Sequence, residues 1–387
     1  MKVLILHQHF NTPQTGGALR SYYLATALAS RGIETIVITG HNHPEYQKQD
    51  VDGVEVHYLP VPYDNKFGFT ARTYSFLKFA VKSARLAGLF RDITICYAIS
   101  VPLTVGLTAL WIKKRHRIPF LFEVGDLWPE APIQLGFVQN YWLRKFLFGL
   151  EKKIYHQANA IVALSTAIRS AIEEKVPGKT IHLIPNMADI DFYRPTIHQK
   201  AFTGQGKFIV SYVGAVGVAN GLDYFLECAN ASRKADLPVQ FLLCGEGAMV
   251  DRLKASAARL GLPNLTFMGF LNREQVRDVL NTSDASFVCY KTAPVLETGS
   301  PNKYFDGLAA GKLIIINFGG WIGREIQENR CGIYVDPREP LDFVRKIKPF
   351  LEEQSNSLQQ FQEAARQLAE KRYSRKMISE RFAAIFL

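Results

Sequence analysis

Short apolar runs alternate with amphipathic segments along almost the whole chain. The run KVLILH at residues 2–7 is followed by a polar loop, by the segment ALRSYYLATALASRG at 18–32 and by a second apolar run, ETIVIT, at 34–39. Short apolar runs between turn signals are typical of buried strands, and apolar residues spaced three and four apart are typical of helices. The pattern therefore predicts a strand–helix–strand unit at the start of the chain.

The same alternation continues in two stretches. Further buried strands are predicted at VEVHYL, ITICYA, PFLFEV, AIVALS and IHLIPN, and then at FIVSYVG, VQFLLCG, LTFMGF, ASFVCY, LIIINF and GIYVD. Continuous apolar strands separated by helices favour parallel sheets covered on both faces, so we predict an α/β protein with two doubly wound, Rossmann-like domains. Ligands of such domains are expected at the carboxyl ends of the strands.

A polar segment with proline and glycine, residues 193–207, interrupts the alternation and predicts a domain boundary near residues 194–207. We therefore expect an N-terminal domain over 1–195, a C-terminal domain over 196–372, and a helix over 373–387 that packs back on the first domain. Two domains also follow from the length of 387 residues, because a single hydrophobic core rarely grows so large.

Composition and charge narrow the class of protein. The chain is 48% hydrophobic and 21% charged, which is typical of a soluble globular protein. The excess of 46 Lys and Arg over 35 Asp and Glu gives a net charge of +11 and favours anionic partners such as phosphates, nucleic acid or acidic lipid. Five scattered cysteines without a C-x-x-C pair are expected to be reduced in a cytosolic protein.

Targeting signals are absent from the pattern. The apolar stretch in MKVLILHQHF is too short for a signal peptide, and nowhere do eighteen apolar residues follow one another. We therefore expect a cytoplasmic protein that does not span a membrane.

The segment ETGSPNKYFDGLAAGK at 297–312 combines helix-terminus signals with charged residues. Ser300 is a good N-cap, Pro301 suits the first helical position and Gly311 suits a left-handed C-terminal cap, so a short helix is predicted over 301–310.

The first turn of this predicted helix carries Asn302 and Lys303. Free backbone N–H groups, the helix dipole and the Lys303 charge would converge there and attract an anion, typically phosphate. Asp306 lies one turn later on the same face and could accept hydrogen bonds from the ribose of a nucleotide. An ordinary capped helix with a solvated Lys and Asp explains the pattern equally well.

Glycines follow the predicted strand ends in pairs, at positions where backbone can approach a phosphate closely. The pairs are Gly16 and Gly17, Gly214 and Gly217, and Gly245 and Gly247. For each pair alone, a tight turn that needs glycine for steric reasons is the simpler explanation. The chain has no complete G-x-G-x-x-G motif opening a helix and no Walker sequence, which counts against dinucleotide oxidoreductases and P-loop enzymes.

The order of these motifs along the chain resembles the family-4 glycosyltransferases. The matching segments are the early Gly-Gly loop, NAIVALS, LIPNMADIDFYRP, YVG followed by GLDYFLECA, LLCGEG, LTFMGFL and YFDGLAAGKLIIINFGG. The segment DLWPE at Asp126 to Glu130 is similar to the polysaccharide-assembly branch of that family. The resemblance covers essentially the whole chain.

The resemblance implies the GT-B fold, with an acceptor-binding first domain and a donor-binding second domain facing a central cleft. It also implies a retaining hexosyltransferase that uses a nucleotide sugar, most often a UDP-sugar, without a cofactor or an essential metal. The acceptor would be a saccharide or a lipid-linked saccharide in cell-surface polysaccharide synthesis.

The chain departs from the family at two places. Where the family usually places an Arg and a Lys that meet the donor diphosphate, this chain has Ala215 and Asn220. Of two family glutamates separated by seven residues, the second corresponds to Asp306, and the nearest candidate for the first, Glu297, is separated from it by eight. We therefore give Lys303 the main role in holding the diphosphate, Asp306 the ribose and Glu297 a contact with the sugar.

The remaining expected site residues come from other loops. Backbone at Gly16 and Gly17 would close over the diphosphate, as would Gly214 and Gly245, and Gly269 with Phe270 would border the base. Asp126 or Glu123 would orient or deprotonate an acceptor hydroxyl, although loop carboxylates that only cap or pair are an equal alternative. The expected catalytic set is thus Lys303, Asp126 and Glu297, with Ser300 and Asn302 also at the donor.

Two acidic or histidine clusters suggest a metal at first sight. The DID sequence at Asp189 to Asp191 lies in a turn that has no metal role in the family, and His7 and His9 have no evident third ligand. We expect no metal site.

Basic and aromatic residues are interleaved in three segments of the first domain. They are residues 67–91, residues 112–120 and the segment YWLRKFLFGLEKK at 141–153. Such segments can lie on an anionic membrane and collect a lipid-linked acceptor, or they can be amphipathic helices that pack on their own domain. Nucleic acid is not expected, because no recognised module accompanies the charge.

Two other functions remain open. The missing Arg and Lys also fit a nucleotide-sugar-binding protein of the same fold that has lost catalysis. A nucleotide-sugar epimerase on this scaffold is the third hypothesis.

Overall fold

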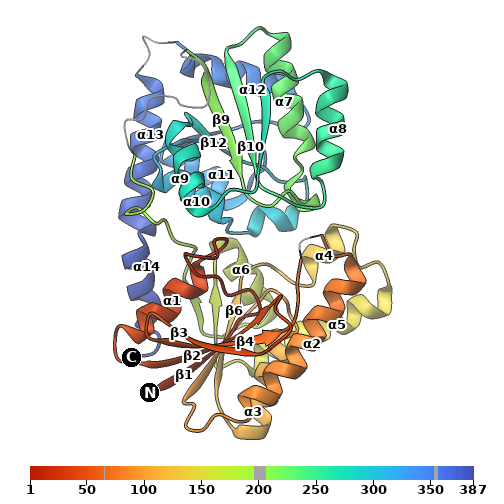
Figure 1. Cartoon of the computed structure of the whole chain (residues 1–387), viewed down its shortest axis with the longest axis vertical. Helices are drawn as coiled ribbons and strands as arrows, with labels where there is room; N and C mark the ends of the chain where they lie inside the picture. Colours follow the sequence, from red (N-terminus) through yellow and green to blue (C-terminus); the bar gives the residue numbers. More distant parts are fainter. Residues whose placement is uncertain (65, 196–205, 353–355) are drawn as a thin grey trace. The chain divides into compact units, whose positions relative to one another are not determined.

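The computed structural model describes residues 1–64, 66–195, 206–352 and 356–387. Figure 1 shows the chain, which divides into two compact units. Unit 1 comprises Met1–Pro185, Thr298–Ser300 and Ile378–Leu387, and unit 2 comprises Asn186–Glu297 and Pro301–Met377. The division at Pro185 lies before the predicted domain end at residue 195, and residues 196–205 of the predicted boundary lie outside the described residues.

Unit 1 is built on an eight-stranded sheet in the order β3-β4-β2-β1-β5-β6-β7-β8. All neighbouring strands run parallel except β3, which is antiparallel to β4. The strands are β1 Lys2–Leu6, β2 Glu34–His41, β3 Gln47–Val51, β4 Val54–Pro60, β5 Ile95–Ile99, β6 Phe120–Val124, β7 Ala160–Ala163 and β8 Ile181–Leu183.

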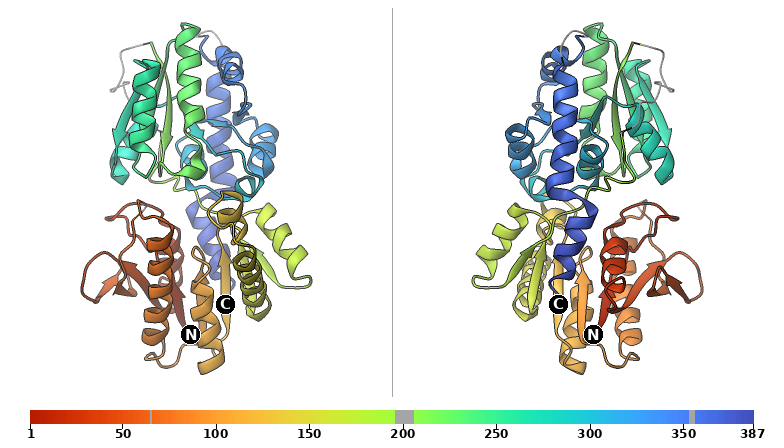
Figure 2. Two further views of the ribbon diagram at one scale, coloured as in Figure 1. Left: turned by 90° about the vertical axis from the view of Figure 1, so that its right-hand side faces the viewer. Right: turned by 90° about the vertical axis from the view of Figure 1, so that its left-hand side faces the viewer.

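The helices of unit 1 connect these strands and cover both faces of the sheet (Figure 2). They are α1 Arg20–Ala29, α2 Phe69–Ala87, α3 Val105–His116, α4 Glu130–Gln134, α5 Tyr141–Gln157, α6 Thr166–Lys175 and α14 Arg375–Ala383. Because α1 leads from β1 to one side of the sheet and α2 leads back across to β5, right-handed crossovers place them on opposite faces. The end of the chain packs on unit 1, where the Phe382 ring meets the Tyr97 ring edge-on at 4.9 Å.

Unit 2 contains a six-stranded, fully parallel sheet in the order β11-β10-β9-β12-β13-β14. The strands are β9 Phe208–Val213, β10 Val239–Cys244, β11 Leu265–Gly269, β12 Ala285–Val288, β13 Leu313–Ile316 and β14 Gly332–Tyr334. The strands β11 and β14, at the two edges, are partly exposed, whereas the other four strands are wholly or largely buried. This is why their sequences are nearly continuous apolar runs.

The helices of unit 2 again cover both faces. The elements are η1 Val218–Asn220, α7 Asp223–Lys234, α8 Val250–Leu260, α9 Arg273–Thr282, η2 Pro294–Thr298, α10 Asn302–Ala309, α11 Gly320–Glu328, α12 Pro340–Ile347, η3 Lys348–Phe350, α13 Ser357–Leu368 and η4 Ala369–Tyr373. On the face of α7 and α12, rings of Phe225, Phe241 and Phe287 pack edge to face with centroids 5.2 and 5.5 Å apart. Such aromatic packing supplies much of the core of this unit.

The order of the strands locates the ligand edge of unit 2. Helix α7 leads from β9 to β10 on one side, whereas β12 lies on the other side of β9. The carboxyl ends of β9 and β12 therefore flank the point where the strand order reverses, which is where doubly wound sheets bind ligands. In unit 1 the equivalent point lies between β1 and β5.

The start of α10 differs from the prediction. The helix begins at Asn302, and Pro301, in extended conformation, occupies the N-cap position without a side-chain cap bond. The prediction of Ser300 as the cap was wrong, because the buried Ser300 lies one residue too early to reach the first turn as an N-cap. The left-handed Gly311 (φ +60°) after the helix is confirmed.

Candidate functional site

Lys303 reaches from the first turn of α10 to the carboxyl end of β9. Its Nζ donates hydrogen bonds to Tyr212 Oη and to Asn220 Oδ1, both at 2.8 Å. The ammonium also lies over the Tyr212 ring, 4.4 Å from the centroid, and 5.7 Å from the centroid of Tyr290. Three elements of unit 2, α10, β9 and η1, and the loop after β12 thus meet at the Lys303 side chain.

The surroundings of Lys303 are poor in charge. Desolvation by burial lowers the pKa of Lys303 to about 8, and the neighbouring Cys289 opposes this shift only in part. Among the ion pairs of the described residues, none involves Lys303. A half-buried cation held only by neutral groups is suited to an anionic ligand.

Asp306 lies one turn after Lys303 and is half-buried. Burial raises its pKa to about 7; Arg273 at the start of α9 works against this shift, and Asp189 adds to it. Arg273 itself forms an ion pair with Asp189 and lies over the Phe192 ring at 3.7 Å. Asp306 therefore carries a carboxyl group of unusually high proton affinity beside the phosphate-type site.

Glu297 lies in the turn η2 before α10. Its carboxylate lies beside Gly319, where an added Cβ would be 3.3 Å from Oε2, and its backbone carbonyl closely approaches Gly320. Gly320 has φ +75°, so glycine is required here both for the conformation and for the space. The structure thus places Glu297 against the loop that follows β13.

The glycines after β9 and β10 have a steric explanation. A Cβ on Gly245 would overlap the carbonyl oxygen of Gly214, and Gly245 has φ +141°. Gly245 N donates to Gly269 O at 2.7 Å, so three strand ends are joined by backbone. These contacts support the steric alternative for Gly245. Gly269 (φ +71°) has open space around it, and the adjacent Phe270 is 65% exposed.

A pocket of about 350 Å³ lies on the α7 side of the same strand ends. It shares Tyr290 with the surroundings of Lys303, and its lining contains both polar and apolar residues. The lining includes Gly217, Gly221, Asp223, Arg252, Asn317 and Pro337. Buried Asn317 holds the main chain of Tyr290 with two hydrogen bonds of 2.8 Å, which fixes the wall between the pocket and Lys303.

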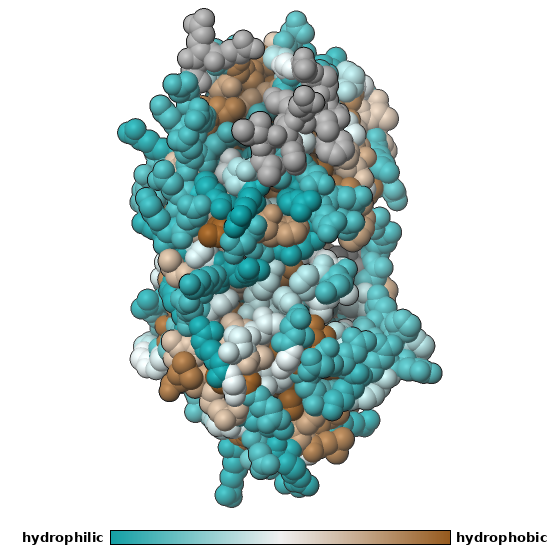
Figure 3. All heavy atoms as spheres, turned by 60° about the vertical axis from the view of Figure 1, so that its left-hand side comes forward, coloured by the Kyte–Doolittle hydropathy of each residue, from teal (hydrophilic) through white to brown (hydrophobic). Residues whose placement is uncertain are grey.

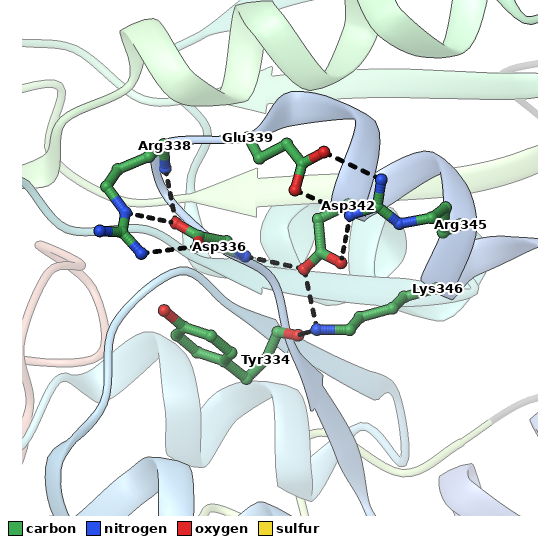
Figure 4. Close-up of polar contacts among 7 residues, drawn as sticks. All are labelled: Tyr334, Asp336, Arg338, Glu339, Asp342, Arg345 and Lys346. Carbon is green, nitrogen blue, oxygen red and sulfur yellow. Dashed lines mark hydrogen bonds and ion pairs between the residues drawn. The ribbon is translucent and has the colours of Figure 1, made fainter.

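An ionic network supports the rim of this pocket at Pro337 (Figure 4). Asp342 of α12 accepts from the backbone N–H of Asp336 at 2.9 Å and from Lys346 Nζ at 2.8 Å. Arg345 bridges Glu339 and Asp342, and Arg338 pairs with Asp336. These bonds lower the pKa of Asp342 and fix the loop between β14 and α12, a structural role that motifs alone did not reveal.

In unit 1, Gly16 and Gly17 lie in the loop after β1 with φ of +72° and +84°. Gly16 has open space around it, and a Cβ on Gly17 would touch Asn11 Nδ2 at 3.0 Å. Both need the left-handed conformation, and at Gly16 backbone is open to a ligand.

The two histidines of this loop are held neutral. Burial lowers the pKa of His7 to about 3 and that of His9 to about 4. His7 Nδ1 bonds to Ser21 Oγ at 2.8 Å, and the His9 ring packs on Tyr63 with centroids 4.4 Å apart. The described part of the chain contains no group of three or more His, Cys, Asp or Glu arranged to hold a metal ion.

Asp126 and Glu123 differ in exposure. Asp126 follows β6 and is exposed. Glu123 is buried, with its carboxylate bonded to Arg20 Nε at 3.0 Å and to the Tyr97 hydroxyl. Glu123 thus matches the alternative of a carboxylate that pairs internally, and only Asp126 is open to a substrate.

The sequence identified Lys303 and Asp306 but not the residues that surround them. Tyr212 was hidden within an apolar strand, and Asn220 drew attention only as a departure from the family pattern. Their contacts with Lys303 join residues 91 and 83 positions apart. No local signal in the sequence could have paired them.

Each half of the chain matches a family of known proteins. Residues 15–187 match the family described as glycosyl transferase 4-like domain, and residues 193–368 match glycosyl transferases group 1. A Bacillus subtilis (strain 168) protein named for teichuronic acid biosynthesis, the glycosyltransferase TuaH, is 23% identical over 238 residues. The match covers 60% of this chain and 58% of TuaH.

Solved structures agree on the fold. Sucrose-phosphate synthase from Thermosynechococcus elongatus matches with a TM-score of 0.78 and 15% identity, over 100% of this chain and 98% of that one. Anabaena HepE in complex with UDP-glucose matches with a TM-score of 0.71 and 17% identity, over 100% and 99%.

Proposed function

The chain belongs to the family-4 glycosyltransferases and has their GT-B fold, and from this premise we propose a specific reaction. The protein moves a hexosyl group from a UDP-sugar to a saccharide or lipid-linked saccharide acceptor in cell-surface polysaccharide synthesis. The observation that carries the proposal is the Lys303 ammonium, which lies without a described carboxylate partner at the carboxyl end of β9. This is the point of a doubly wound sheet where an anionic ligand is expected.

Lys303 would act on the leaving group. As the glycosidic bond breaks, negative charge grows on the departing diphosphate, and a half-buried ammonium fixed in place stabilises that charge more than it stabilises the ground state. The free N–H groups at the start of α10, including those of Asn302 and Lys303, add to this effect. In the proposed retaining reaction the acceptor attacks on the face from which the diphosphate leaves, and no protein nucleophile is assigned.

The remaining site residues are proposed to orient the two substrates. Asp306 accepts from the ribose hydroxyls, Phe270 borders the base, and Glu297 contacts the sugar. On unit 1, the exposed Asp126 orients or deprotonates the acceptor hydroxyl, and backbone at Gly16 covers the diphosphate. The choice of uridine is supported by the structural similarity to HepE, whose solved complexes contain UDP or UDP-glucose.

The acceptor side is supported by exposed aromatic residues on α5. Tyr141, Trp142 and Phe146 are 66%, 71% and 64% exposed, beside the exposed basic residues Arg144 and Lys145. Aromatic and basic residues together are typical of surfaces that lie on anionic lipid. Among the described helices, none combines the length and the hydrophobicity that a membrane span requires. We propose that the enzyme works in the cytoplasm at the inner face of the cell membrane, and that it needs no metal.

Calorimetric titration with UDP, GDP and NAD in the absence of metal tests the donor. Lys303→Ala should weaken binding of one nucleoside diphosphate about tenfold or more, because a charge-assisted hydrogen bond is lost. Lys254→Ala is the matched control, since it removes the same charge from an exposed position on α8. If both diphosphates fail to bind, or if the two variants bind alike, the site has been misidentified.

Two other functions predict different products. Slow hydrolysis of the bound nucleotide sugar that disappears in Lys303→Ala supports a transferase, whereas tight donor binding without hydrolysis or transfer supports a protein that has lost catalysis. An epimerase would release an altered free nucleotide sugar without any acceptor.

A further inference from the structure

The acceptors of the Lys303 ammonium are arranged as a closed ring of hydrogen bonds. The Tyr212 hydroxyl donates to Ala215 O at 2.7 Å, and Asn220 Nδ2 donates to the same carbonyl oxygen at 2.9 Å. Lys303 Nζ then donates to the two remaining oxygens, Tyr212 Oη and Asn220 Oδ1. One carbonyl thus orients both groups that hold the ammonium.

The ring fixes the direction of each bond. The single hydroxyl hydrogen of Tyr212 is given to Ala215, so its oxygen can only accept from Lys303. The amide of Asn220 is oriented in the same way, with its NH₂ group on Ala215 and its oxygen on Lys303. An ammonium has three N–H donors, and within the described part of the chain only two of them have an acceptor.

The backbone of the loop leaves room for this arrangement. A Cβ on Gly214 would lie 3.2 Å from Lys303 Cε, so the lysine stem passes directly over that residue. Gly221 closes the loop in the left-handed conformation (φ +55°), and a Cβ there would lie 2.7 Å from Lys291 N. Glycine at 214 therefore leaves room for the Lys303 stem, and glycine at 221 lets the end of the loop pack against Lys291.

We infer that Asn220 and Tyr212 are positioning residues that hold the Lys303 ammonium in place while leaving its charge uncompensated and its third N–H free for a diphosphate oxygen. The inference rests on the proposed function for the identity of the ligand. The two partners of the Lys303 ammonium must be neutral, because a carboxylate at position 220 would hold the lysine equally well but would neutralise its charge.

Position 220 provides the decisive variants. Asn220→Asp has nearly the same shape and adds one negative charge, whereas Asn220→Ala removes the contact without adding charge. Both lose the bond to Ala215 O, so they share the effect of that loss on the loop. UDP should bind at least about tenfold more weakly to Asn220→Asp than to the wild type, and more weakly than to Asn220→Ala.

Two readouts separate positioning from a structural role. The loss of UDP affinity at alkaline pH, which reports deprotonation of Lys303, should move to higher pH in Asn220→Asp, because a neighbouring carboxylate favours the ammonium. The double variant Lys303→Ala with Asn220→Lys should recover part of the affinity lost in Lys303→Ala alone, since the longer side chain at 220 can extend past the place of Asn220 Oδ1 into the space that Lys303 Nζ vacates. Tyr212→Phe, which keeps the ring and removes one acceptor, gives a second variant whose binding should weaken several-fold.

Titration with inorganic pyrophosphate distinguishes the inference from the proposed function. If pyrophosphate follows the same order of variants while UDP does not bind, the inference about Asn220 holds and the proposed donor is wrong. If Asn220→Asp binds both ligands as tightly as the wild type and its alkaline limb does not move, the inference is overturned even though Lys303→Ala remains impaired. If Lys303→Ala itself binds both ligands normally, both proposals fail.

Discussion

At the scale of single residues, the pKa values of Lys303 and Asp306 are displaced towards each other. Lys303 is lowered to about 8 and Asp306 is raised to about 7, in both cases mainly by burial. Lys303 and Asp306 are charged at the same time only between about pH 7 and about pH 8. UDP affinity in the free enzyme should therefore be greatest between about pH 7 and pH 8 and fall on both sides.

The two limbs of this profile can be assigned by substitution. As pH rises through 8 the ammonium is lost, and as it falls through 7 the carboxylate is protonated, so calorimetry across this range should show a bell-shaped dependence. UDP itself takes up a proton near about pH 6. The Asp306→Asn substitution does not change this protonation of UDP. Only the part of the acid limb that moves in this variant therefore belongs to Asp306. A profile unchanged in Asp306→Asn would contradict the assignment.

A second prediction at this scale concerns Gly245. Alanine there would overlap the Gly214 carbonyl and adopt φ +141°, so two strand ends must separate. We expect Gly245→Ala to lower the free energy of unfolding of unit 2 by about 3 kcal/mol or more, measured by denaturant titration.

Gly269→Ala is the matched control for this substitution. It also has positive φ but has open space, so it should cost only about 1 kcal/mol for the left-handed conformation. Equal losses in both variants would mean that backbone conformation, and not the contact with Gly214, makes glycine necessary at 245.

At the scale of elements, the apolar runs predicted the sheets because parallel strands buried on both faces are made mostly of apolar residues. Both strands of the first predicted unit and all eleven further runs are strands in the structure, β1, β2 and β4 to β14. The strand that escaped prediction is β3, QKQDV, a polar, mostly exposed antiparallel edge strand. The strand β3 is held by backbone hydrogen bonds to β4, and backbone bonds leave no apolar pattern in the sequence.

The same limit applies to the site. Helix-end chemistry located Lys303 because dipole and capping signals are local in sequence. It misassigned Ser300, since the cap depends on the backbone conformation of Pro301 (ψ 131°), which side-chain type does not specify. It could not supply Tyr212 and Asn220, because those contacts exist only after β9 and α10 have packed into one unit.

At the scale of the whole molecule, the net charge of +11 and the exposed aromatics of α5 support one partner, an anionic lipid surface. Residues 137–149 contain no acidic side chain, and Glu151 further along α5 is buried against Lys175. Hydrophilic residues predominate on the face drawn in Figure 3, with smaller hydrophobic patches between them. The α5 residues Trp142 and Phe146 are thus the best candidates to enter a lipid interface.

Co-sedimentation with phosphatidylglycerol vesicles tests this prediction on the full chain. Replacing Trp142 and Phe146 by Ser should reduce vesicle binding about tenfold or more, because two aromatic side chains no longer enter the interface. Each of Arg144 and Lys145 replaced by Gln should reduce it about fivefold, and added salt should weaken the wild type. UDP affinity should stay unchanged in all of these variants, since the residues that hold Lys303 are in unit 2.

The control for vesicle binding is Leu341→Ser, which removes an exposed apolar side chain from α12 in unit 2. Neutral phosphatidylcholine vesicles provide the second control, because they offer the same acyl boundary without the charge. Equal binding to anionic and neutral vesicles would mean that the basic residues of α5 do not contribute to lipid binding. Binding to anionic vesicles that survives the loss of Trp142 and Phe146 would move the contact to the exposed residues of α2, where Tyr74 and Leu77 are 67% and 48% exposed.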